Sequence, residues 1–234
     1  MRWPLSAPGL PRLLGVNAGF IDAATYLALK GLFAAHVTGN FVTLGAALVL
    51  GSSGVLAKIL ALPVFCIVVL IARLSTYGLR ARSLPAMSTL LVAELALMIL
   101  GAALATWFGP FATADGTAAL MTGMILVAAM AIQNGAHRAH LPRAPPSTVM
   151  TSTTTQIMMD VADLAHGLAP ETAKATRRRL TEMTASVVAF VVGCTLGALL
   201  YAWLGVLCFW IPPLLVLGVL AMRTELAEAD LLRS

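Results

Sequence analysis

Charged residues are scarce in this chain of 234 residues. They make up 11% of the sequence, hydrophobic residues make up 59%, and the mean hydropathy is +0.91. A soluble domain typically carries about 25% charged residues to cover its surface. The composition therefore excludes an ordinary soluble domain and predicts an integral membrane protein.

Cysteine is also rare, and its placement excludes two kinds of site. Cys66, Cys194 and Cys208 lie inside apolar runs without paired spacing. We expect no disulfide framework and no zinc site, and we interpret the three as small buried hydrophobic residues. A glycine-rich phosphate loop and a nucleophile elbow are absent as well. The sequence thus favours a protein that is not an enzyme and predicts no cofactor and no metal.

Basic residues outnumber acidic ones, giving a net charge of +5 and a pI near 9.6. Most of them lie in short loops between apolar runs, as in the cytoplasmic loops of membrane proteins. No separate basic domain is present. The charge therefore predicts contact with the lipid bilayer and not with nucleic acid.

Six apolar runs are long enough to cross the hydrocarbon core, which takes about 20 residues. They lie near residues 13–30, 56–79, 86–107, 116–137, 182–204 and 206–222. Two further segments, 34–48 and 147–164, are too short or too polar to cross. If 34–48 crossed, Arg80 and Arg82 would lie outside, against the positive-inside rule. We therefore expect both segments to enter and leave on one face, with both termini in the cytoplasm.

The order of these segments predicts an inverted repeat. Span, short segment, span, span occurs over 13–107 and again over 116–222, and the second copy begins on the opposite face. The expected fold is an all-α polytopic membrane protein, a single membrane domain over 1–234, with six transmembrane helices and two re-entrant or half-helix segments. Similarity between the halves is weak: residues 36–40 can be set against 149–153, and Asp22 against Asn134. Short segments at a repeat interface indicate a binding site.

Three stretches also carry a resemblance to a known family. They are GFIDAATYLALKGLFAAHVTGN, then IQNGAHR, then TVMTSTTTQ. Together they resemble the YoaK-like family of bacterial inner-membrane proteins, a family of unknown function. The similarity covers nearly the whole chain and is most specific over 22–40, whereas Ser152 stands where members typically have glycine. The resemblance implies a polytopic protein of the bacterial inner membrane and no particular activity.

Two acidic residues lie near the middle of predicted spans. A carboxylate at this depth is costly unless it is paired, hydrated or protonated, and such residues commonly mark pathways or proton relays. For Asp22 we weigh that role against a structural hydrogen bond to the neighbouring re-entrant segment. Glu94 has the same alternatives, as a functional group or as a protonated acid bonded to a neighbouring helix. A hydrolase that uses both carboxylates stays open, because carboxylates alone specify no reaction.

A polar turn follows the first span and leads into the first short segment. Gly39 permits unusual dihedral angles or a close approach, and Thr38 or Asn40 can cap the first helical turn. The exposed amides of such a helix start can bind a solute, or the turn can simply satisfy the buried helix end. His36 is a titratable group or an ordinary hydrogen-bond donor.

Further polar side chains lie in the second half. Gln133 and Asn134 close the fourth span, where they can orient a solute or pack helices together. Residues 151–155 form a run of hydroxyls, from which Thr151 and Thr153 are candidate pathway residues, although membrane threonines often bond to their own backbone. Asp160 and Asp163 share a helical face and are expected to pair with the basic cluster that ends at Arg179.

The sequence therefore favours a small membrane transporter of a small polar solute or ion, with proton exchange at Asp22 as the leading mechanism. The candidate substrate-binding residues are Asp22, His36, Thr38, Gly39, Asn40, Glu94, Gln133, Asn134, Thr151 and Thr153. A passive aquaporin-like channel and a non-transport membrane enzyme or assembly factor remain the alternatives. The sequence leaves open whether the chain forms a homo-oligomer.

Overall fold

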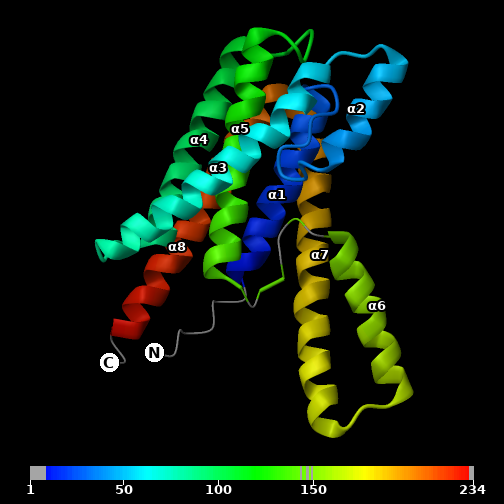
Figure 1. The fold of residues 1–234 in the computed structure, drawn as a ribbon, viewed down its shortest axis with the longest axis vertical. Coiled ribbons are helices and arrows are strands. Elements are labelled where there is room, and N and C mark those ends of the chain that lie inside the picture. Colours follow the sequence, from blue (N-terminus) through cyan, green and yellow to red (C-terminus); the bar gives the residue numbers. More distant parts are fainter. Residues whose placement is uncertain (1–8, 143, 146–147, 149, 232–234) are drawn as a thin grey trace.

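The computed structural model describes residues 9–142, 144–145, 148 and 150–231, and every regular element in this part is a helix. The bundle is shown in Figure 1. In chain order the elements are α1 (Gly9–Ala28), α2 (Gly39–Leu50), α3 (Val55–Ala81), α4 (Ala86–Phe108), α5 (Thr117–His140), α6 (Met150–His166), α7 (Pro170–Leu204), the 3-10 helix η1 (Gly205–Trp210) and α8 (Ile211–Leu231).

Helices that suit a membrane make up most of this bundle. α3, α4, α5 and the continuous run Pro170–Met222 are long and apolar enough to cross a bilayer. α1 is less apolar, since it contains Arg12, Asn17 and Asp22, and it is buried along most of its length by its neighbours. A central helix shielded by protein tolerates polar groups that a lipid-facing helix does not. The prediction of a helical membrane protein is confirmed.

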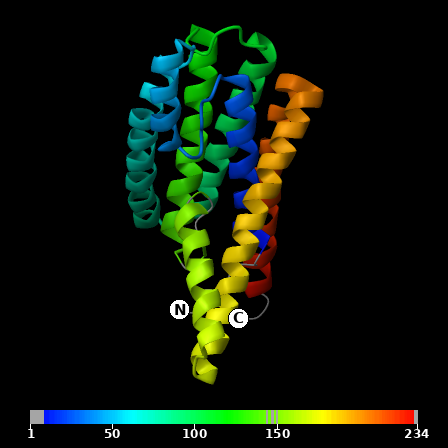
Figure 2. The same cartoon turned by 90° about the vertical axis from the view of Figure 1, so that its right-hand side faces the viewer.

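The fifth predicted run is the one that the structure extends most. α7 begins at Pro170, twelve residues before the predicted start at 182, because its charged first part continues the helix next to α6. Proline suits the first helical turn, and Glu171 there complements the helix dipole. Arg178 and Glu182 form an i,i+4 pair further along. α6 and this part of α7 make a hairpin that extends beyond the rest of the bundle (Figures 1 and 2).

α1 and α7 cross at very short range because glycines face each other. Each helix carries glycines four residues apart, Gly15 and Gly19 on α1, Gly193 and Gly197 on α7. A Cβ at Gly19 would lie 2.2 Å from the Phe190 carbonyl oxygen, and one at Gly193 would lie 2.1 Å from the Val16 carbonyl oxygen. Only glycine allows the two backbones to approach this closely, as in other small-residue crossings in membranes.

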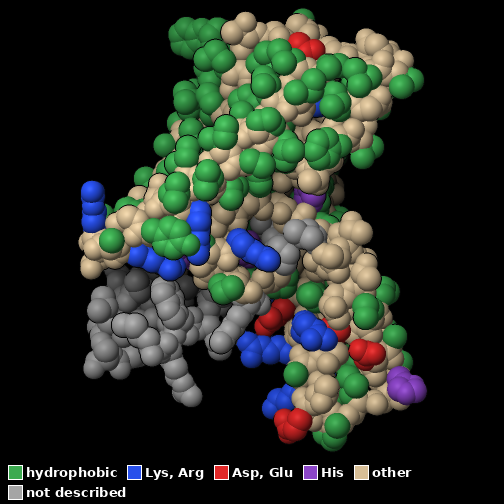
Figure 3. All heavy atoms as spheres, viewed as in Figure 1, with side chains coloured by type: hydrophobic (Ala, Val, Ile, Leu, Met, Phe, Trp, Pro, Cys, Tyr) green, Lys and Arg blue, Asp and Glu red, His purple; other side chains and the backbone are tan. Residues whose placement is uncertain are grey.

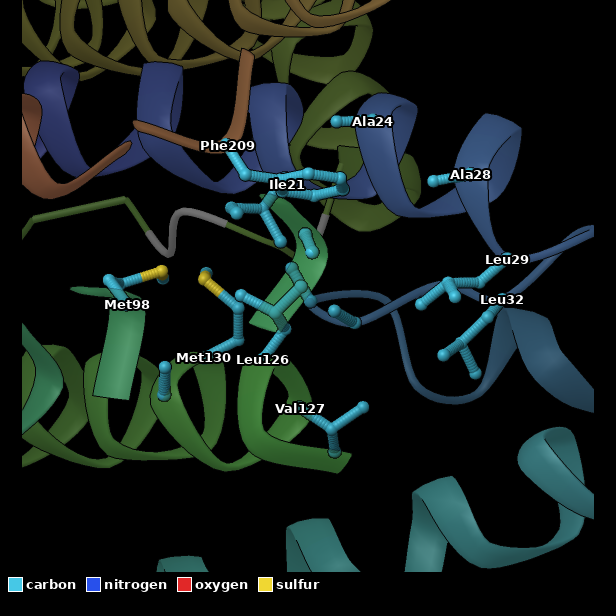
Figure 4. Close-up of a cluster of buried hydrophobic side chains, with 14 of the residues drawn as sticks. Ile21, Ala24, Ala28, Leu29, Leu32, Met98, Leu126, Val127, Met130 and Phe209 are labelled. Atoms are coloured by element: carbon cyan, nitrogen blue, oxygen red, sulfur yellow. The ribbon is translucent and has the colours of Figure 1, made fainter. Parts of the chain in front are cut away.

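Two apolar clusters fill the interior at different levels. One contains Ile21, Met98, Leu126, Met130 and Phe209, whose side chains converge between α1, α4, α5 and η1 (Figure 4). The other is made of Leu10, Leu14, Ala72, Met87, Leu90, Leu91, Ile132, Ala136 and Val219. Residues between these two levels on α1, α4 and α5 are therefore surrounded by apolar side chains on both sides.

The first short segment starts and finishes at one end of the bundle. Lys58 on α3 donates from Nζ to the carbonyl oxygen of Lys30 at 2.9 Å and to that of Ser53 at 3.4 Å. Asp115, in the loop before α5, accepts bonds from the amides of Gly54 and Leu56 at the start of α3. Residues 31–53 thus leave this end and return to it.

The exposed surface of α3 is largely apolar. On α3 the exposed side chains include Ile67, Leu70 and Leu74, which suits contact with lipid. Cys66 is exposed on this helix, so its interpretation as a buried residue is wrong; Cys194 is partly buried and Cys208 is buried. A small apolar cysteine is as acceptable against lipid as in a core, and the sequence does not separate the two.

Candidate functional site

Asp22 binds the non-helical segment that connects α1 to α2. Its Oδ1 accepts the amide of Ala35 at 2.7 Å, and its Oδ2 accepts the amide of His36 at 3.2 Å. The same oxygen contacts Nδ1 of His36 at 2.5 Å. The carboxylate is 96% shielded from solvent, and the imidazole is 27% exposed. Asp22 therefore supplies acceptors to backbone that has no helical partners, and it also contacts the imidazole of His36.

Asn40 holds the same segment from the other side. Its side-chain oxygen accepts the amide of Phe33 at 2.8 Å, and its side-chain nitrogen donates to the carbonyl of Phe33 at 2.8 Å. Asn40 is buried on the first turn of α2. The side-chain amide of Asn40 thus satisfies both the N–H and the C=O group of Phe33, and this fixes the segment against the start of α2.

The start of α2 has neither the side-chain cap nor the free backbone amides that the sequence predicts. Thr38 makes no side-chain cap bond and is exposed. The amides of Gly39, Asn40 and Phe41 donate to the carbonyls of His36, Val37 and Thr38. The predicted side-chain cap is therefore wrong, because a tight turn uses these amides first. Gly39 has no left-handed dihedrals; a Cβ there would lie 3.0 Å from the Phe33 ring.

A cavity of about 560 Å³ opens beside the Asp22 and His36 pair. Its walls come from α1, the segment before α2, the first turn of α2 and α7. The lining residues are Asp22, Ala23, Tyr26, Leu27, Phe33, His36, Gly39, Phe190, Cys194 and Ala198. The His36 ring lies edge-on to Phe190, with 4.9 Å between ring centroids. One acid and one imidazole thus face a largely aromatic and aliphatic space, as in many solute-binding pockets.

A second polar cluster lies in the centre of the bundle. The side-chain nitrogen of Asn17 on α1 donates to Gln133 on α5 at 2.7 Å and to Glu94 on α4 at 3.4 Å. The Gln133 nitrogen donates to the carbonyl of Leu14 at 3.1 Å. Glu94 and Gln133 have no exposed surface. The predicted residues Glu94 and Gln133 come together here, apart from the residues that line the cavity.

Sequence reasoning missed Asn17, which connects this cluster. The side chains it joins are 77 and 116 residues away in the chain. A lone asparagine in an apolar run gives no periodic signal. The signal that could have found it is its occurrence together with Asp22 in one span, because two polar residues in an apolar run are typical of a helix shielded by its neighbours.

The remaining predicted residues lie in the second half of the chain. Asn134 accepts a bond from the Thr148 hydroxyl at 2.7 Å. Thr151 is exposed on α6, and its carbonyl accepts the hydroxyl of Thr155. Thr153 is buried on the same helix. Thr151 therefore lies outside both clusters, and bonding of hydroxyls to their own helix explains part of the run.

The expected ion pair between α6 and the basic cluster is present. Arg179 donates to both oxygens of Asp160, at 2.8 Å from Nε and 2.6 Å from the second nitrogen. Gln156 adds a third bond to the carboxylate at 2.8 Å. The bonds from Arg179 hold the pKa of Asp160 below its ordinary value, so this buried carboxyl is ionised at neutral pH. The pair fastens α6 to α7.

These features define a class of protein, a polytopic helical membrane protein in which polar side chains fix the non-helical connection between α1 and α2. In the described ranges, no group of three His, Cys, Asp or Glu residues could hold a metal ion. Its family is shown by sequence. The chain belongs to the family described as "Protein of unknown function (DUF1275)", whose model matches residues 10–222. The resemblance to the YoaK-like family is thereby confirmed. No curated protein and no solved structure matches the chain.

Proposed function

We propose that the protein transports a small polar solute across the bacterial inner membrane, with proton exchange at the Asp22 and His36 pair. One observation carries this proposal: the buried carboxylate of Asp22, in the second half of α1, contacts an imidazole at the wall of a cavity of about 560 Å³. Titratable groups at such a depth commonly mark a transport pathway. A proton on this pair changes the charge that a solute in the cavity meets.

The cavity walls favour an organic solute over a bare ion. An inorganic ion needs several oxygen ligands to replace its hydration shell. Here the two polar side chains lie among Tyr26, Phe33 and Phe190. A molecule with an apolar part and one amino or hydroxyl group would place its polar end at Asp22 and His36 and its apolar part against the rings.

The packing of the helices supports an inverted repeat. The contact of α1 with α7 corresponds to that of α5 with α3, and the contact of α2 with α3 corresponds to that of α6 with α7. The contact of α4 with α5 corresponds to that of α8 with α1. Exchanging the first four helices with α5 to α8 therefore maps each of these contacts onto another. α2 and α6 also run outward in opposite directions from the bundle (Figure 1). Repeats of this kind support alternating access around a site between the halves.

Two polar contacts favour a particular alignment of the halves. His36 contacts Asp22 from fourteen residues further on, and Thr148 bonds Asn134 across the same separation. Both members of the second pair lie 112 residues after those of the first. This agrees with the predicted alignment of Asp22 with Asn134. It aligns His36 with Thr148, one residue before position 149, with which the sequence comparison aligned it. The second half thus carries a neutral version of the same contact.

The central cluster favours a transporter over an open channel. Asn17, Glu94 and Gln133 are buried in a layer between two apolar clusters. A passive channel needs a continuous polar path at this level. A closed layer instead suits a protein that opens to one side at a time.

For orientation, we propose that both termini and the α6–α7 hairpin lie in the cytoplasm. Lysine and arginine side chains gather in the lower half of the visible face (Figure 3). The positive-inside rule assigns that end to the cytoplasm.

Cysteine labelling tests this orientation. In a background with Cys66, Cys194 and Cys208 replaced, Ser52→Cys is expected to react with a membrane-impermeant reagent added outside, and Ala81→Cys only with reagent added inside. Both positions are exposed at helix ends. Reaction of Ser52→Cys only from the cytoplasmic side would overturn this orientation.

Filling the cavity tests the transport proposal. A thermal-shift screen of purified protein against amines, amino acids and monocarboxylates first finds a binder, because ligands stabilise the folded state. Ala198→Phe places a ring in the cavity and is expected to weaken binding and uptake of that compound about tenfold, equivalent to about 1.4 kcal/mol.

Leu196→Phe is the matched control, since Leu196 is 41% exposed on the same helix and does not line the cavity. It should bind and transport like the wild type. Equal loss in both variants would assign the effect to α7 in general, and the absence of any binder or uptake would favour a non-transport function.

A further inference from the structure

The central cluster contains polar atoms that nothing in the described structure satisfies. Oε2 of Glu94 and Oδ1 of Asn17 are buried and have no hydrogen-bond partner. They belong to two side chains that already contact each other at 3.4 Å. An unpaired buried acceptor loses its hydration without compensation, and the penalty is larger if it is charged. Two such acceptors on neighbouring side chains indicate a missing donor.

The surroundings of Glu94 offer no counter-charge. On α4 it lies between Leu91 and Met98, which belong to the two apolar clusters. Its side chain is completely buried, and among the described residues it forms no ion pair and its only polar contact is with the neutral amide of Asn17. An ionised carboxylate here would be a buried unpaired charge. The neutral acid avoids that penalty.

We infer that Glu94 is a second proton-binding site, separate from the Asp22 and His36 pair. The proton on Glu94 is held by a hydrogen bond to the side chain of Asn17. One proton on the carboxyl converts Oε2 from an unpaired acceptor into a donor, and Oδ1 of Asn17 is the unpaired acceptor on the adjacent side chain. A bare metal cation fits less well, because Gln133 Oε1 already accepts from Asn17 and a cation needs several free oxygens.

His137 is placed to guide water to this cluster. It lies one turn beyond Gln133 on the same face of α5, it is buried, and neither ring nitrogen has a hydrogen-bond partner. Arg138 is the charged group that acts on it. When the layer opens to water, the proton of Glu94 passes to an entering water molecule and leaves a carboxylate, and the neutral imidazole of His137 accepts a hydrogen bond from that water. The carboxylate regains a proton by the reverse steps.

Infrared spectroscopy tests the protonated state without any transport assay. At neutral pH the wild type should show a buried carboxylic-acid C=O band that Glu94→Gln lacks. The glutamine amide can donate to Asn17 as the protonated acid does, so this variant should keep the wild-type unfolding temperature. Glu94→Asp should keep an acid band at a shifted frequency, which preserves the test if Glu94→Gln fails to fold. A band unaffected by both substitutions would overturn the proposal.

Hydrogen–deuterium exchange of the same band tests the exchange route. After transfer to deuterated buffer, His137→Leu should slow the isotope shift of the Glu94 band at least about tenfold. His166→Leu is the control, because His166 is an exposed histidine at the end of α6. Equal exchange rates in wild type and His137→Leu would exclude His137 from the exchange route. Because both measurements follow the carboxyl itself, a protein that moves no solute would still give a decisive result.

Discussion

Replacing Gly193 by leucine is expected to prevent the protein from reaching a stable fold. A Cβ at this position would lie 2.1 Å from the Val16 carbonyl oxygen and 3.0 Å from the Phe20 amide nitrogen, both backbone atoms of α1. Backbone cannot move aside as a side chain can, so α1 and α7 must separate. Overpacking typically costs about 1–3 kcal/mol and occasionally more, and here it also displaces the helix that carries Asp22.

The measurement is the unfolding temperature and monodispersity of the purified variant in detergent. For a chain of this size, each kcal/mol corresponds to about 2–4 °C, so we expect a decrease of at least about 5 °C or loss of a folded peak. Gly78→Leu is the matched control, since Gly78 is an exposed helical glycine on α3 and a Cβ there would meet nothing within 4 Å. It should match or exceed the wild type, because leucine favours helix over glycine. Similar values for both variants would contradict the close crossing.

The positions of the helices were largely predictable because apolar run length is a local property. The predicted runs 56–79, 86–107 and 116–137 each fall within two or three residues of α3, α4 and α5. The early start of α7 was not predictable from hydropathy, since residues 170–181 are charged and their helix depends on α6. The spaced glycines on α1 and α7 are visible in the sequence, but spacing alone does not say which helices meet.

The candidate site was predictable in composition and not in arrangement. The sequence marked Asp22, His36 and Asn40, and the structure brings them to one segment because all lie within nineteen consecutive residues. It gave no reason to separate Glu94 and Gln133 from that group. Their partner Asn17 is defined by the packing of α1 against α4 and α5, and such long-range contacts leave no trace in local spacing.

Asp22 also shows why a structural role and a functional role are not exclusive. The sequence alternatives were a proton-exchanging group and a hydrogen bond to the neighbouring segment, and the amides of Ala35 and His36 do bond to it. These bonds fix the segment that lines the cavity. In the proposed mechanism, the contact of His36 with the same carboxylate is the part that exchanges protons.

Substitutions at Asp22 separate these two roles. Asp22→Asn is expected to fold, because its oxygen still accepts the amides of Ala35 and His36, while its nitrogen can donate to Nδ1 of a neutral His36. The loss should be about 1 kcal/mol, the net value of one typical hydrogen bond. Asp22→Leu leaves two buried amides unpaired at about 1–3 kcal/mol each, so its unfolding temperature should fall well below that of Asp22→Asn.

Transport then identifies the proton-exchanging role. In liposomes with an imposed pH gradient, Asp22→Asn should take up the compound found by the screen without the gradient dependence of the wild type, because the amide cannot exchange a proton with His36. Glu94→Gln, measured alongside, reports on the other buried acid. If Asp22→Asn keeps its gradient dependence and Glu94→Gln loses it, coupling belongs to the central cluster and Asp22 serves to hold the segment before α2. If both variants and the wild type respond equally to the gradient, neither carboxyl couples transport to protons, and a passive route becomes the better description.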